Sequence, residues 1–308
     1  MSKRKKRGIS IGVCLLLCAV CGFASLALEG VLMAGGGGST LDDTEEIPET
    51  VPVRAPLLLS SDDSSAMNIN AETDADVNGD GITIEHIYGG TYEGYMMVVE
   101  DPEDVFIAIN PGMSSGAAGP ELDWYVENFN AVGGINGGGF EDYDGNGDGS
   151  IPAGIVIMDG KLVSGGSAQP IVGITAEHKL ICTTCTGEQA LNMGIVEAVT
   201  FGPTLIEDGE VVYTTQTSLN MLNPRTAIGQ KEDGTFLLLV IDGRGPSSFG
   251  AKYEDIVEIM LDYGAVNASN LDGGNSSVMI YNGQYVHYPV SMYNSRNLPS
   301  VILVKGDE

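Results

Sequence analysis

The sequence is poor in basic residues. Lysine and arginine together supply 14 of its 308 residues, against 42 aspartates and glutamates, which gives a formal net charge of −28. Six of the 14 lie in the first 54 residues, so the remaining 254 residues hold only eight. A chain this acidic repels the phosphate backbone of DNA and RNA. The composition therefore excludes a general nucleic-acid-binding protein.

Cysteine and histidine are also scarce, with five and three residues. Cys14, Cys18 and Cys21 lie in an apolar run, where cysteine acts as a small hydrophobic residue. Cys182 and Cys185 form one C-x-x-C pair, and a zinc site would need two further ligands. A short-range disulfide is the alternative for this pair if the chain lies outside the cytoplasm. The sequence contains no nucleophile elbow, Walker loop or dinucleotide fingerprint.

The N-terminus carries a basic cluster followed by a long apolar run. Residues 1–8 include five consecutive basic residues, and residues 9–28 carry no charge. Twenty helical residues at about 1.5 Å each span the roughly 30 Å hydrocarbon core of a bilayer. The pattern predicts a single-pass signal anchor over residues 9–33 in the cell membrane, with residues 1–8 in the cytoplasm. A cleaved signal peptide is the alternative, and either one places the remaining chain outside the cytoplasm.

An acidic segment separates this apolar run from the rest of the chain. Residues 34–80 begin with four glycines after Ala34, and contain eleven acidic residues and one basic residue, Arg54. Such a segment buries too little apolar surface to offset the entropy lost on ordering. We therefore expect a flexible tether over residues 34–80 and one folded domain over residues 81–308.

Turn signals within residues 81–308 predict a sheet-rich domain. Residues 105–109 form an apolar strand, and four turn dipeptides lie between apolar stretches: Asp159-Gly160, Asp208-Gly209, Asp233-Gly234 and Asn282-Gly283. Helices are expected over residues 120–129 and 251–263. In the second helix, apolar residues recur at helical spacing before Gly264, which can end it: Tyr253, Ile256, Val257, Met260 and Leu261. The predicted fold class is α+β, with mostly antiparallel sheet and a few helices.

Four stretches rich in glycine or carrying arginine stand out in this domain. They are NGGGF at 136–140, NPRTAIG at 223–229, IDGR at 241–244 and NLDGGNSS at 270–277. Glycine lets a ligand approach the backbone closely, and consecutive amide groups can bind an anion. Arginine offers phosphate a planar pair of donors. Asp272, beside such a group of amides, is a candidate base or substrate ligand.

Together with FGPTLIEDG at 201–209 and SRNLPS at 295–300, these stretches resemble the phosphodiester glycosidase family. The resemblance covers about residues 90–305 and consists of six motifs in the family's order and spacing. It implies a hydrolase that cleaves sugar-1-phosphodiester (glycosyl-phosphate) linkages, in envelope or exopolysaccharide glycans. The implied substrate is a phosphorylated glycan or sugar phosphate, and no cofactor is required.

The mechanism implied by the resemblance is hydrolysis at an anomeric carbon with a phosphate monoester as leaving group. The transition state then resembles an oxocarbenium ion, and positive donors on the phosphate matter more than a strong general acid. Arg225 is assigned to the phosphate with Arg244 or Arg296 in support, and Asp272 to water activation or contact with the sugar. The further candidates are Asp242 and Glu141 as catalytic carboxylates, and Asn136, Gly137, Gly138, Thr226, Gly273, Gly274, Asn275, Ser276 and Ser277 as substrate-binding residues.

One acidic loop has the spacing of a calcium site. Asp144, Asn146 and Asp148 would supply oxygen ligands at loop positions 1, 3 and 5, and Asp142 lies close in sequence. The usual glutamate at position 12 is missing, as it is in a similar string at 76–81. A polar turn without metal is the alternative for both Ca²⁺ sites. A non-catalytic, calcium-dependent glycan-binding module is likewise the alternative to the hydrolase.

Overall fold

The computed structural model describes residues 72–74, 79–141, 147–214, 221–287 and 296–306. All of these residues belong to one unit of the chain, Asp63–Glu308. Within these ranges, no helix has the length and hydropathy needed to span a bilayer. The predicted anchor over residues 9–33 lies outside the described residues, and it stays a prediction.

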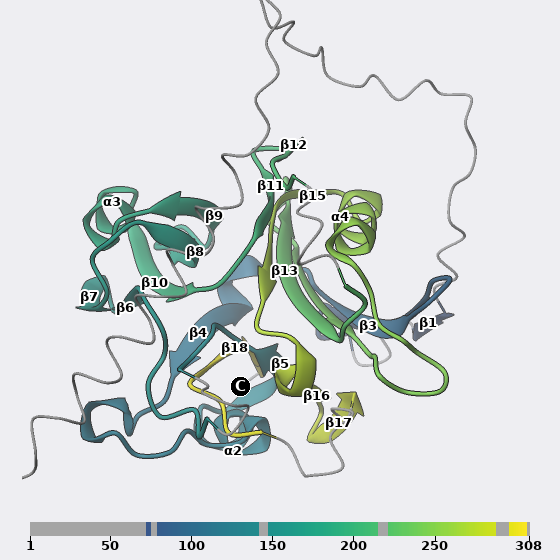
Figure 1. Ribbon diagram of the computed structural model, residues 1–308, viewed down its shortest axis with the longest axis horizontal. Coiled ribbons are helices and arrows are strands. Elements are labelled where there is room, and N and C mark those ends of the chain that lie inside the picture. The colour runs from purple at the N-terminus through teal and green to yellow at the C-terminus, as the bar shows by residue number, and fades with distance from the viewer. Residues whose placement is uncertain (1–71, 75–78, 142–146, 215–220, 288–295, 307–308) are drawn as a thin grey trace, which may run out of the picture. The chain divides into compact units, whose positions relative to one another are not determined.

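Three sheets form the body of the fold (Figure 1). The large sheet has the strand order β1 (Glu72–Asp74), β2 (Ile82–Tyr88), β3 (Glu93–Val99), β14 (Phe236–Ile241), β13 (Arg225–Lys231), β15 (Ala265–Leu271), β11 (Thr204–Glu207) and β12 (Glu210–Val211). The β8 sheet has the order β7 (Lys161–Ser164), β6 (Val156–Met158), β10 (Ile195–Thr200), β8 (Gln169–Thr175) and β9 (Leu180–Cys185). The β5 sheet has the order β17 (Gln284–His287), β16 (Met279–Tyr281), β5 (Ala131–Asn136), β18 (Ser300–Lys305) and β4 (Val105–Ile109). Every pairing among the described strands is antiparallel, which confirms the predicted sheet type.

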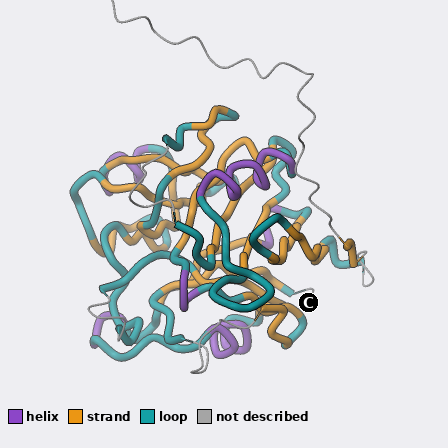
Figure 2. Tube along the Cα trace, turned by 45° about the vertical axis from the view of Figure 1, so that its right-hand side comes forward, coloured by secondary structure: helices purple, strands orange, loops and turns teal. Residues whose placement is uncertain are grey.

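Helices are few, and strands supply most of the regular structure (Figure 2). The described α-helices are α2 (Leu122–Asn128), α3 (Gly187–Asn192) and α4 (Tyr253–Asp262), and the 3₁₀ turns are η1 (Pro102–Asp104), η2 (Met113–Ser115) and η4 (Gly274–Ser276). Helices α2 and α4 lie inside the two predicted ranges, whereas the six residues of α3 are too few for a periodic signal. In α4 the prediction for Leu261 was wrong, because Leu261 is 43% exposed and Ile259 is buried instead. Gly264 follows the helix with φ +82°, as expected for a helix end.

All four predicted hairpin turns are confirmed. Three of them join the adjacent strand pairs β6–β7, β11–β12 and β16–β17, and both residues of each dipeptide have positive φ. That geometry suits the right-handed twist of the two flanking strands. The fourth dipeptide, Asp233-Gly234, lies in the turn between β13 and β14. Local backbone preferences therefore set these four connections.

Strand β1 lies inside the segment predicted to be a flexible tether. Its three residues pair with β2, with Glu72 opposite His86. An edge strand of this kind is held by backbone hydrogen bonds, which leave no hydrophobic pattern in the sequence. The tether prediction was therefore wrong for residues 72–74.

The disulfide considered as an alternative for Cys182 and Cys185 does not form, because both cysteines are free and buried. They lie on β9 three positions apart, so their side chains point to opposite faces of the strand. Cys182 packs in the core that contains Val172, whereas Cys185 packs in the core that contains Ile171. Burial raises the pKa of both thiols.

Alkylation should distinguish free thiols at Cys182 and Cys185 from a disulfide between them. We expect iodoacetamide to leave Cys182 and Cys185 unmodified in the native protein, because the thiolate is the reactive form and burial disfavours it. After denaturation without a reducing agent, peptide mass spectrometry should find both residues alkylated. Unalkylated residues joined by a Cys182–Cys185 disulfide would contradict the structure.

The large sheet has two different faces, and the strand register assigns each side chain to one of them. One face packs on α4 in a core that includes Ile241 and Ile256, and the other packs against the two smaller sheets in a core that includes Val240. Arg225 pairs with Ile241, and Thr226 pairs with Val240. Paired residues share a face. Arg225 therefore points toward α4, and Thr226 points toward the smaller sheets.

Candidate functional site

Asn136, the last residue of β5, joins three of the motifs and is fully buried. Its Oδ1 accepts hydrogen bonds from Thr226 Oγ1 (2.9 Å) and from the Val278 amide (3.2 Å). Its Nδ2 donates to the carbonyl oxygen of Asp272 (2.5 Å). The side chain therefore uses both ends to hold two other segments against the end of β5. These bonds support a role for Asn136 in fixing the loop, and its predicted contact with substrate stays a prediction.

The glycines after Asn136 allow a close approach between strands. The amide of Gly137 donates to Ser300 O (3.0 Å), and the amide of Gly138 donates to Ser300 Oγ (2.9 Å). A Cβ at Gly137 would lie 2.7 Å from Ser300 Oγ, and one at Gly138 would lie 2.8 Å from Val199 Cβ. Because such contacts are shorter than van der Waals distances, packing alone requires glycine at both positions, whether or not a ligand binds there.

Asp272 lies between this loop and the turn that follows β15. Its amide donates to Gly137 O (3.1 Å), so hydrogen bonds hold its backbone on both sides. The turn continues through η4, where the Gly274 amide donates to Pro224 O (3.0 Å). Ser277 Oγ lies within hydrogen-bond distance of Thr226 Oγ1 (3.1 Å). Motifs far apart in the sequence are therefore joined directly around Asp272.

Ser276 is placed differently from its neighbour Ser277. Its side chain is 1% exposed, and its Oγ has no hydrogen-bond partner among the described residues. A buried hydroxyl in this condition costs free energy unless a water or ligand completes its bonding. This oxygen is therefore a candidate contact for a polar ligand at the turn.

Arg244 brings a guanidinium group to the same turn. Its φ of +61° is left-handed, and its Nη1 donates to Asn275 Oδ1 (2.8 Å) while its Nη2 donates to Asn223 Oδ1 (3.2 Å). A Cβ on Gly274 would lie 3.3 Å from Arg244 Nη2, so the absence of a side chain there leaves room for the guanidinium group. These bonds use two of the five N–H donors of a guanidinium. An exposed cation beside a glycine turn is the arrangement expected of an anion site.

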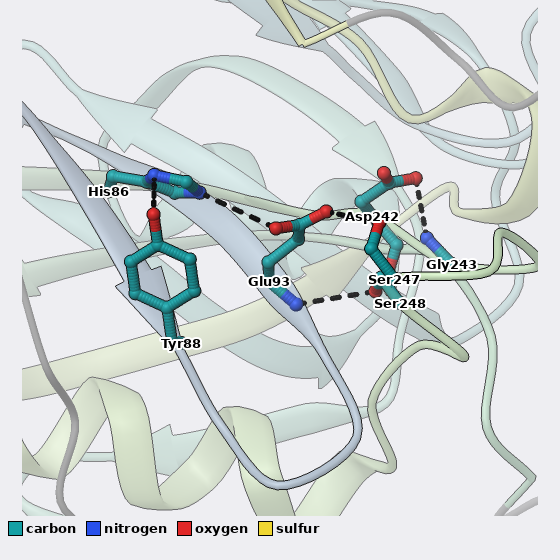
Figure 3. A network of polar contacts seen from close by, with 7 residues as sticks. All are labelled: His86, Tyr88, Glu93, Asp242, Gly243, Ser247 and Ser248. Atoms are coloured by element: carbon teal, nitrogen blue, oxygen red, sulfur yellow. Dashed lines mark hydrogen bonds and ion pairs between the residues drawn. The ribbon is translucent and has the colours of Figure 1, made fainter.

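The loop that carries Arg244 is attached to the β2–β3 hairpin through Glu93 (Figure 3). Glu93 Oε1 accepts from Ser247 Oγ (2.7 Å), and the Glu93 amide donates to Ser248 Oγ (3.3 Å). Glu93 O accepts from the amide of Asp242 (2.9 Å). Because these bonds flank Arg244 on both sides, the hairpin holds the loop from which the guanidinium extends. Sequence reasoning missed Glu93, which resembles any surface acid and contacts residues some 150 positions away.

His86 extends this network along the hairpin (Figure 3). Its Nε2 lies 4.0 Å from Glu93 Oε2, and its Nδ1 is hydrogen-bonded to the Tyr88 hydroxyl. Its ring stacks on Tyr95 with centroids 4.5 Å apart and planes 6° apart. Burial and then the Glu93 charge raise the pKa of Tyr95. The His86 ring therefore limits the positions open to the Glu93 carboxylate.

Arg225 does not join Asn136 and Asp272. Its Nε donates to Ala251 O (3.1 Å), its Nη2 donates to Met221 O (2.8 Å), and its Cζ lies 4.0 Å from the ring centre of Tyr253. The residue is 7% exposed, and it points toward α4. The physical reason is strand alternation, which sends adjacent side chains of β13 to opposite faces. The placement supports a structural role and does not support the predicted contact with phosphate.

The other predicted charged residues lie in two places. Arg296 places its Cζ 4.8 Å from the ring centre of Phe140, beside the NGGGF loop. Glu141 follows Phe140 and is exposed. Asp242 Oδ1 accepts from the Gly243 amide (2.6 Å), so its carboxylate is used within its own loop. Arg296 and Glu141 therefore lie beside the NGGGF loop, whereas Asp242 lies in the loop that carries Arg244.

The predicted Ca²⁺ loop is only partly described. Asp142, Asp144 and Asn146 lie outside the described residues. Asp148 Oδ1 accepts from the Ser150 amide (3.0 Å), and hydrogen bonds from Ser150 lower the pKa of the Asp148 carboxyl. Within the described ranges, no three His, Cys, Asp or Glu side chains gather as metal ligands. The Ca²⁺ site stays a prediction, which calorimetric titration with millimolar Ca²⁺ would test.

Comparison with known proteins identifies the group to which these motifs belong. A sequence profile described as phosphodiester glycosidase matches residues 129–305. The mouse N-acetylglucosamine-1-phosphodiester alpha-N-acetylglucosaminidase is 27% identical over 229 residues, which cover 67% of this chain and 43% of the mouse protein. An SPbeta prophage-derived uncharacterized protein of Bacillus subtilis is 36% identical over 100 residues, which cover 32% of this chain and 16% of that protein. The chain thus spans less than half the length of these curated relatives.

Solved structures show the same fold. The zebrafish N-acetylglucosamine-1-phosphodiester alpha-N-acetylglucosaminidase catalytic domain, auto-inhibited by its pro-peptide, has a TM-score of 0.62 at 23% identity, covering 78% of this chain and 89% of that chain. A putative exported protein of Burkholderia pseudomallei has a TM-score of 0.53 at 17% identity, covering 72% of this chain and 74% of that chain. At these identities the likeness concerns the fold alone.

Proposed function

The chain belongs to the phosphodiester glycosidase family, and we propose that it hydrolyses the bond between the anomeric carbon of a sugar and a phosphodiester oxygen. The observation that carries the proposal is the convergence of four motifs on one turn. Asn136 accepts a hydrogen bond from Thr226 and donates one to Asp272, and Arg244 donates to Asn275. The mammalian relatives are named for action on N-acetylglucosamine-1-phosphodiesters, which supports the same substrate class here.

In this proposal Arg244 binds the phosphate. Its guanidinium is exposed and belongs to a protein with a formal net charge of −28, so it is one of few groups that attract an anion. Planar donors match phosphate oxygens, and they stabilise the negative charge that grows on the leaving oxygen. The adjacent glycines let the phosphate reach backbone amides.

Asp272 is the proposed catalytic carboxylate. Water adds to the anomeric carbon, its proton passes to the Asp272 carboxylate, and the electrons of the C–O bond leave with the phosphate monoester. A carboxylate beside the sugar also stabilises the positive charge of the oxocarbenium-like transition state. The hydrogen bonds to the Asp272 backbone fix the position of the residue before the substrate binds, which lowers the cost of reaching the reactive geometry.

We further propose that the protein acts outside the cytoplasm on envelope or exopolysaccharide glycans, anchored by its N-terminal segment. The basic cluster and apolar run of residues 1–33 support this localisation, and the acidic segment after it would separate the domain from the bilayer. Membrane fractionation and protease accessibility in intact cells test the proposal. Recovery of the whole protein from the soluble cytoplasmic fraction would contradict it.

The activity itself is tested with a synthetic N-acetylglucosamine-1-phosphodiester that carries a neutral alkyl aglycone. Incubation with the purified protein should release free sugar and the phosphate monoester in equal amounts, as measured by NMR. Glycan retention in a pull-down without any release would instead support the non-catalytic binding module.

Replacing Arg244 by Ala should lower kcat/KM for this diester by about 10²-fold, the usual effect of losing one donor to a developing oxyanion. Arg244→Lys should recover part of the loss, because it keeps the charge without the planar pair of donors. Both variants should melt near the wild-type temperature, since Arg244 is exposed. Lys161→Ala, which removes an exposed cation on β7, is the matched control and should leave kcat/KM unchanged.

Glu93→Ala should lower kcat/KM about tenfold by releasing the loop that carries Arg244. The decisive measurement is a double-mutant cycle, which isolates the coupling between two residues. If Glu93 acts through Arg244, Glu93→Ala should have little further effect in the Arg244→Ala background. Additive losses would show that Glu93 acts independently of the arginine.

A further inference from the structure

A pocket of about 630 Å³ lies where β9, β11 and the first residue of α4 meet. This volume falls in the range of small-molecule sites. Eleven described residues line it, and six of them carry a hydroxyl group: Thr183, Thr184, Thr204, Tyr213, Thr214 and Tyr253. Each hydroxyl can both donate and accept a hydrogen bond. The lining therefore matches a ligand that is itself rich in hydroxyl groups.

The residues that line this pocket differ in charge from those at the proposed phosphate site. Glu207 is the one charged residue among the described residues that line it, and none of them is Lys, Arg or His. A phosphate placed here would face a carboxylate without a compensating cation, which is unfavourable. A carboxylate does accept hydrogen bonds from neutral hydroxyl groups. The pocket thus favours a neutral polar ligand over an anion.

The hydroxyl group of Thr204 is a second indication that the pocket binds a polar ligand. Its Oγ1 is buried and has no hydrogen-bond partner among the described residues. A buried hydroxyl in that condition costs free energy, which a polar ligand or a water molecule would recover. Thr204 is one of the residues that line the pocket, so rotation of its side chain between staggered rotamers would bring this hydroxyl to a bound ligand.

The aromatic side of the pocket is held in place by the neighbouring structure. The rings of Tyr213 and Tyr253 lie 5.4 Å apart at 58°, and Arg225 rests on the Tyr253 ring. Pro170 and Pro203 add apolar surface. Rings and apolar carbons of this kind pack against the C–H face of a pyranose while hydroxyl groups bond around its edge. A fixed ring also limits the entropy lost on binding.

The segment Thr200–Thr204 connects the pocket to the candidate active site. The Gly139 amide donates to Thr200 O (3.1 Å), which ties the segment to the NGGGF loop. Asn270 Nδ2 donates to Gly202 O (3.1 Å), and the Asn270 amide donates to Pro203 O (3.1 Å), two residues before Asp272. A ligand in the pocket would therefore contact Gly202 and Pro203, which are bonded directly to the loop that carries Asp272. Thr200, which is bonded to the NGGGF loop, lies two residues before Gly202 in the chain.

We propose that this pocket binds a neutral sugar unit. Its link to catalysis rests on the proposed function: the sugar would belong to the same substrate whose phosphodiester lies at Arg244. Two sets of groups would then bind the substrate. Hydroxyl groups and aromatic rings of the pocket would bind the sugar, and the guanidinium at the turn would bind the phosphate.

The test uses the methyl α-glycoside of N-acetylglucosamine, which has no charge and no scissile phosphate. Saturation-transfer NMR and titration with the full-length protein should detect binding, and Thr204→Val should weaken it about five- to tenfold, the effect of one lost hydrogen bond. Since Thr204 Oγ1 has no partner within the described protein, the isosteric valine should leave the melting temperature equal or higher. Thr183→Val is a second variant with the same expected loss of affinity. Thr83→Val on β2 is the matched control and should bind normally.

Further arms separate the competing explanations. Asp272→Asn should still bind the glycoside, and so should Glu207→Gln, because a neutral ligand does not depend on the carboxylate charge. Binding of cationic glucosamine in place of the glycoside, lost in Glu207→Gln, would overturn the proposal in favour of an amine site. Failure of the wild type to bind the glycoside, or wild-type affinity in both threonine variants, would also overturn it.

Turnover of the diester distinguishes this inference from the proposed function. If the wild type turns over the diester but the Thr204 and Thr183 variants bind the glycoside normally, the sugar-binding proposal for the pocket is refuted and the hydrolase is not. Binding that depends on Thr204, without turnover by the wild type, would refute the hydrolase and leave the sugar site standing.

Discussion

Replacing Asp272 by Asn is expected to lower kcat for the N-acetylglucosamine-1-phosphodiester by about 10²- to 10⁴-fold, the usual contribution of a general acid or base. The amide has the same shape as the carboxylate, but it neither accepts the proton of water nor stabilises a positively charged sugar. The fold should survive, because the bonds that hold Asp272 to Asn136 and Gly137 are made by its backbone. We expect KM to change much less than kcat, since the lost interaction forms in the transition state.

A matched control makes this result specific. Asp208→Asn removes a carboxylate from a hairpin turn with φ +50°, a conformation that asparagine also adopts readily. It should leave both kcat and the melting temperature unchanged. If Asp272→Asn kept more than a third of the wild-type kcat, Asp272 would not be the catalytic carboxylate. Glu141 would be the next candidate, because it is exposed beside the NGGGF loop, whereas Asp242 is engaged by the Gly243 amide.

Arg225→Ala is expected to lower the free energy of unfolding by about 3 kcal/mol. Hydrogen bonds from a charged donor contribute about 1.5–3 kcal/mol each, and a cation above an aromatic ring adds about 1 kcal/mol. Arg225 makes two such bonds, to Ala251 O and Met221 O, and rests on Tyr253. Water reaching the vacated carbonyl groups should recover part of that sum. Urea unfolding should show a lower midpoint with an unchanged slope, which marks a change in stability alone.

Two further variants distinguish the structural role of Arg225 from the role implied by the family resemblance. Arg225→Lys keeps the charge above the ring but reaches fewer carbonyl groups, so it should recover less than half of the lost stability. Arg244→Ala should show the opposite pattern, with a large loss of kcat/KM and little loss of stability. An Arg225→Ala protein with wild-type stability and greatly reduced turnover would restore Arg225 as a phosphate ligand.

The hairpin turns and strand β4 were predictable because their signals are local. Asn-Gly and Asp-Gly can adopt positive φ at low cost between two strands, and an apolar run of five residues is the length of a buried strand. Helix α4 was predictable for the same reason, although the exposure of Leu261 was not. A periodic pattern defines a helix and an approximate face, whereas the neighbouring sheet decides which residues at the margin of that face are covered.

Membership of the candidate site was predictable only in part. Sequence alone identified the glycine and arginine motifs, because glycine is required where backbones or ligands approach closely and few cations are available to bind an anion. It could not separate Arg225 from Arg244. That distinction depends on the β13–β14 register, which turns Arg225 toward α4. The state of Cys182 and Cys185 was left open for the same reason, since only the strand shows that they lie in different cores.

By itself the sequence determined the antiparallel character of the domain, its four predicted hairpin turns and the residue types available to bind a phosphodiester. These properties follow from backbone preferences and side-chain chemistry that each residue carries with it. Only the tertiary structure decided that Asn136 clamps Asp272, that Glu93 holds the Arg244 loop, and that hydroxyl groups from β9, β11 and α4 line one pocket. The reason is physical: these contacts join segments tens to more than a hundred residues apart, and only packing and strand register set the geometry between them.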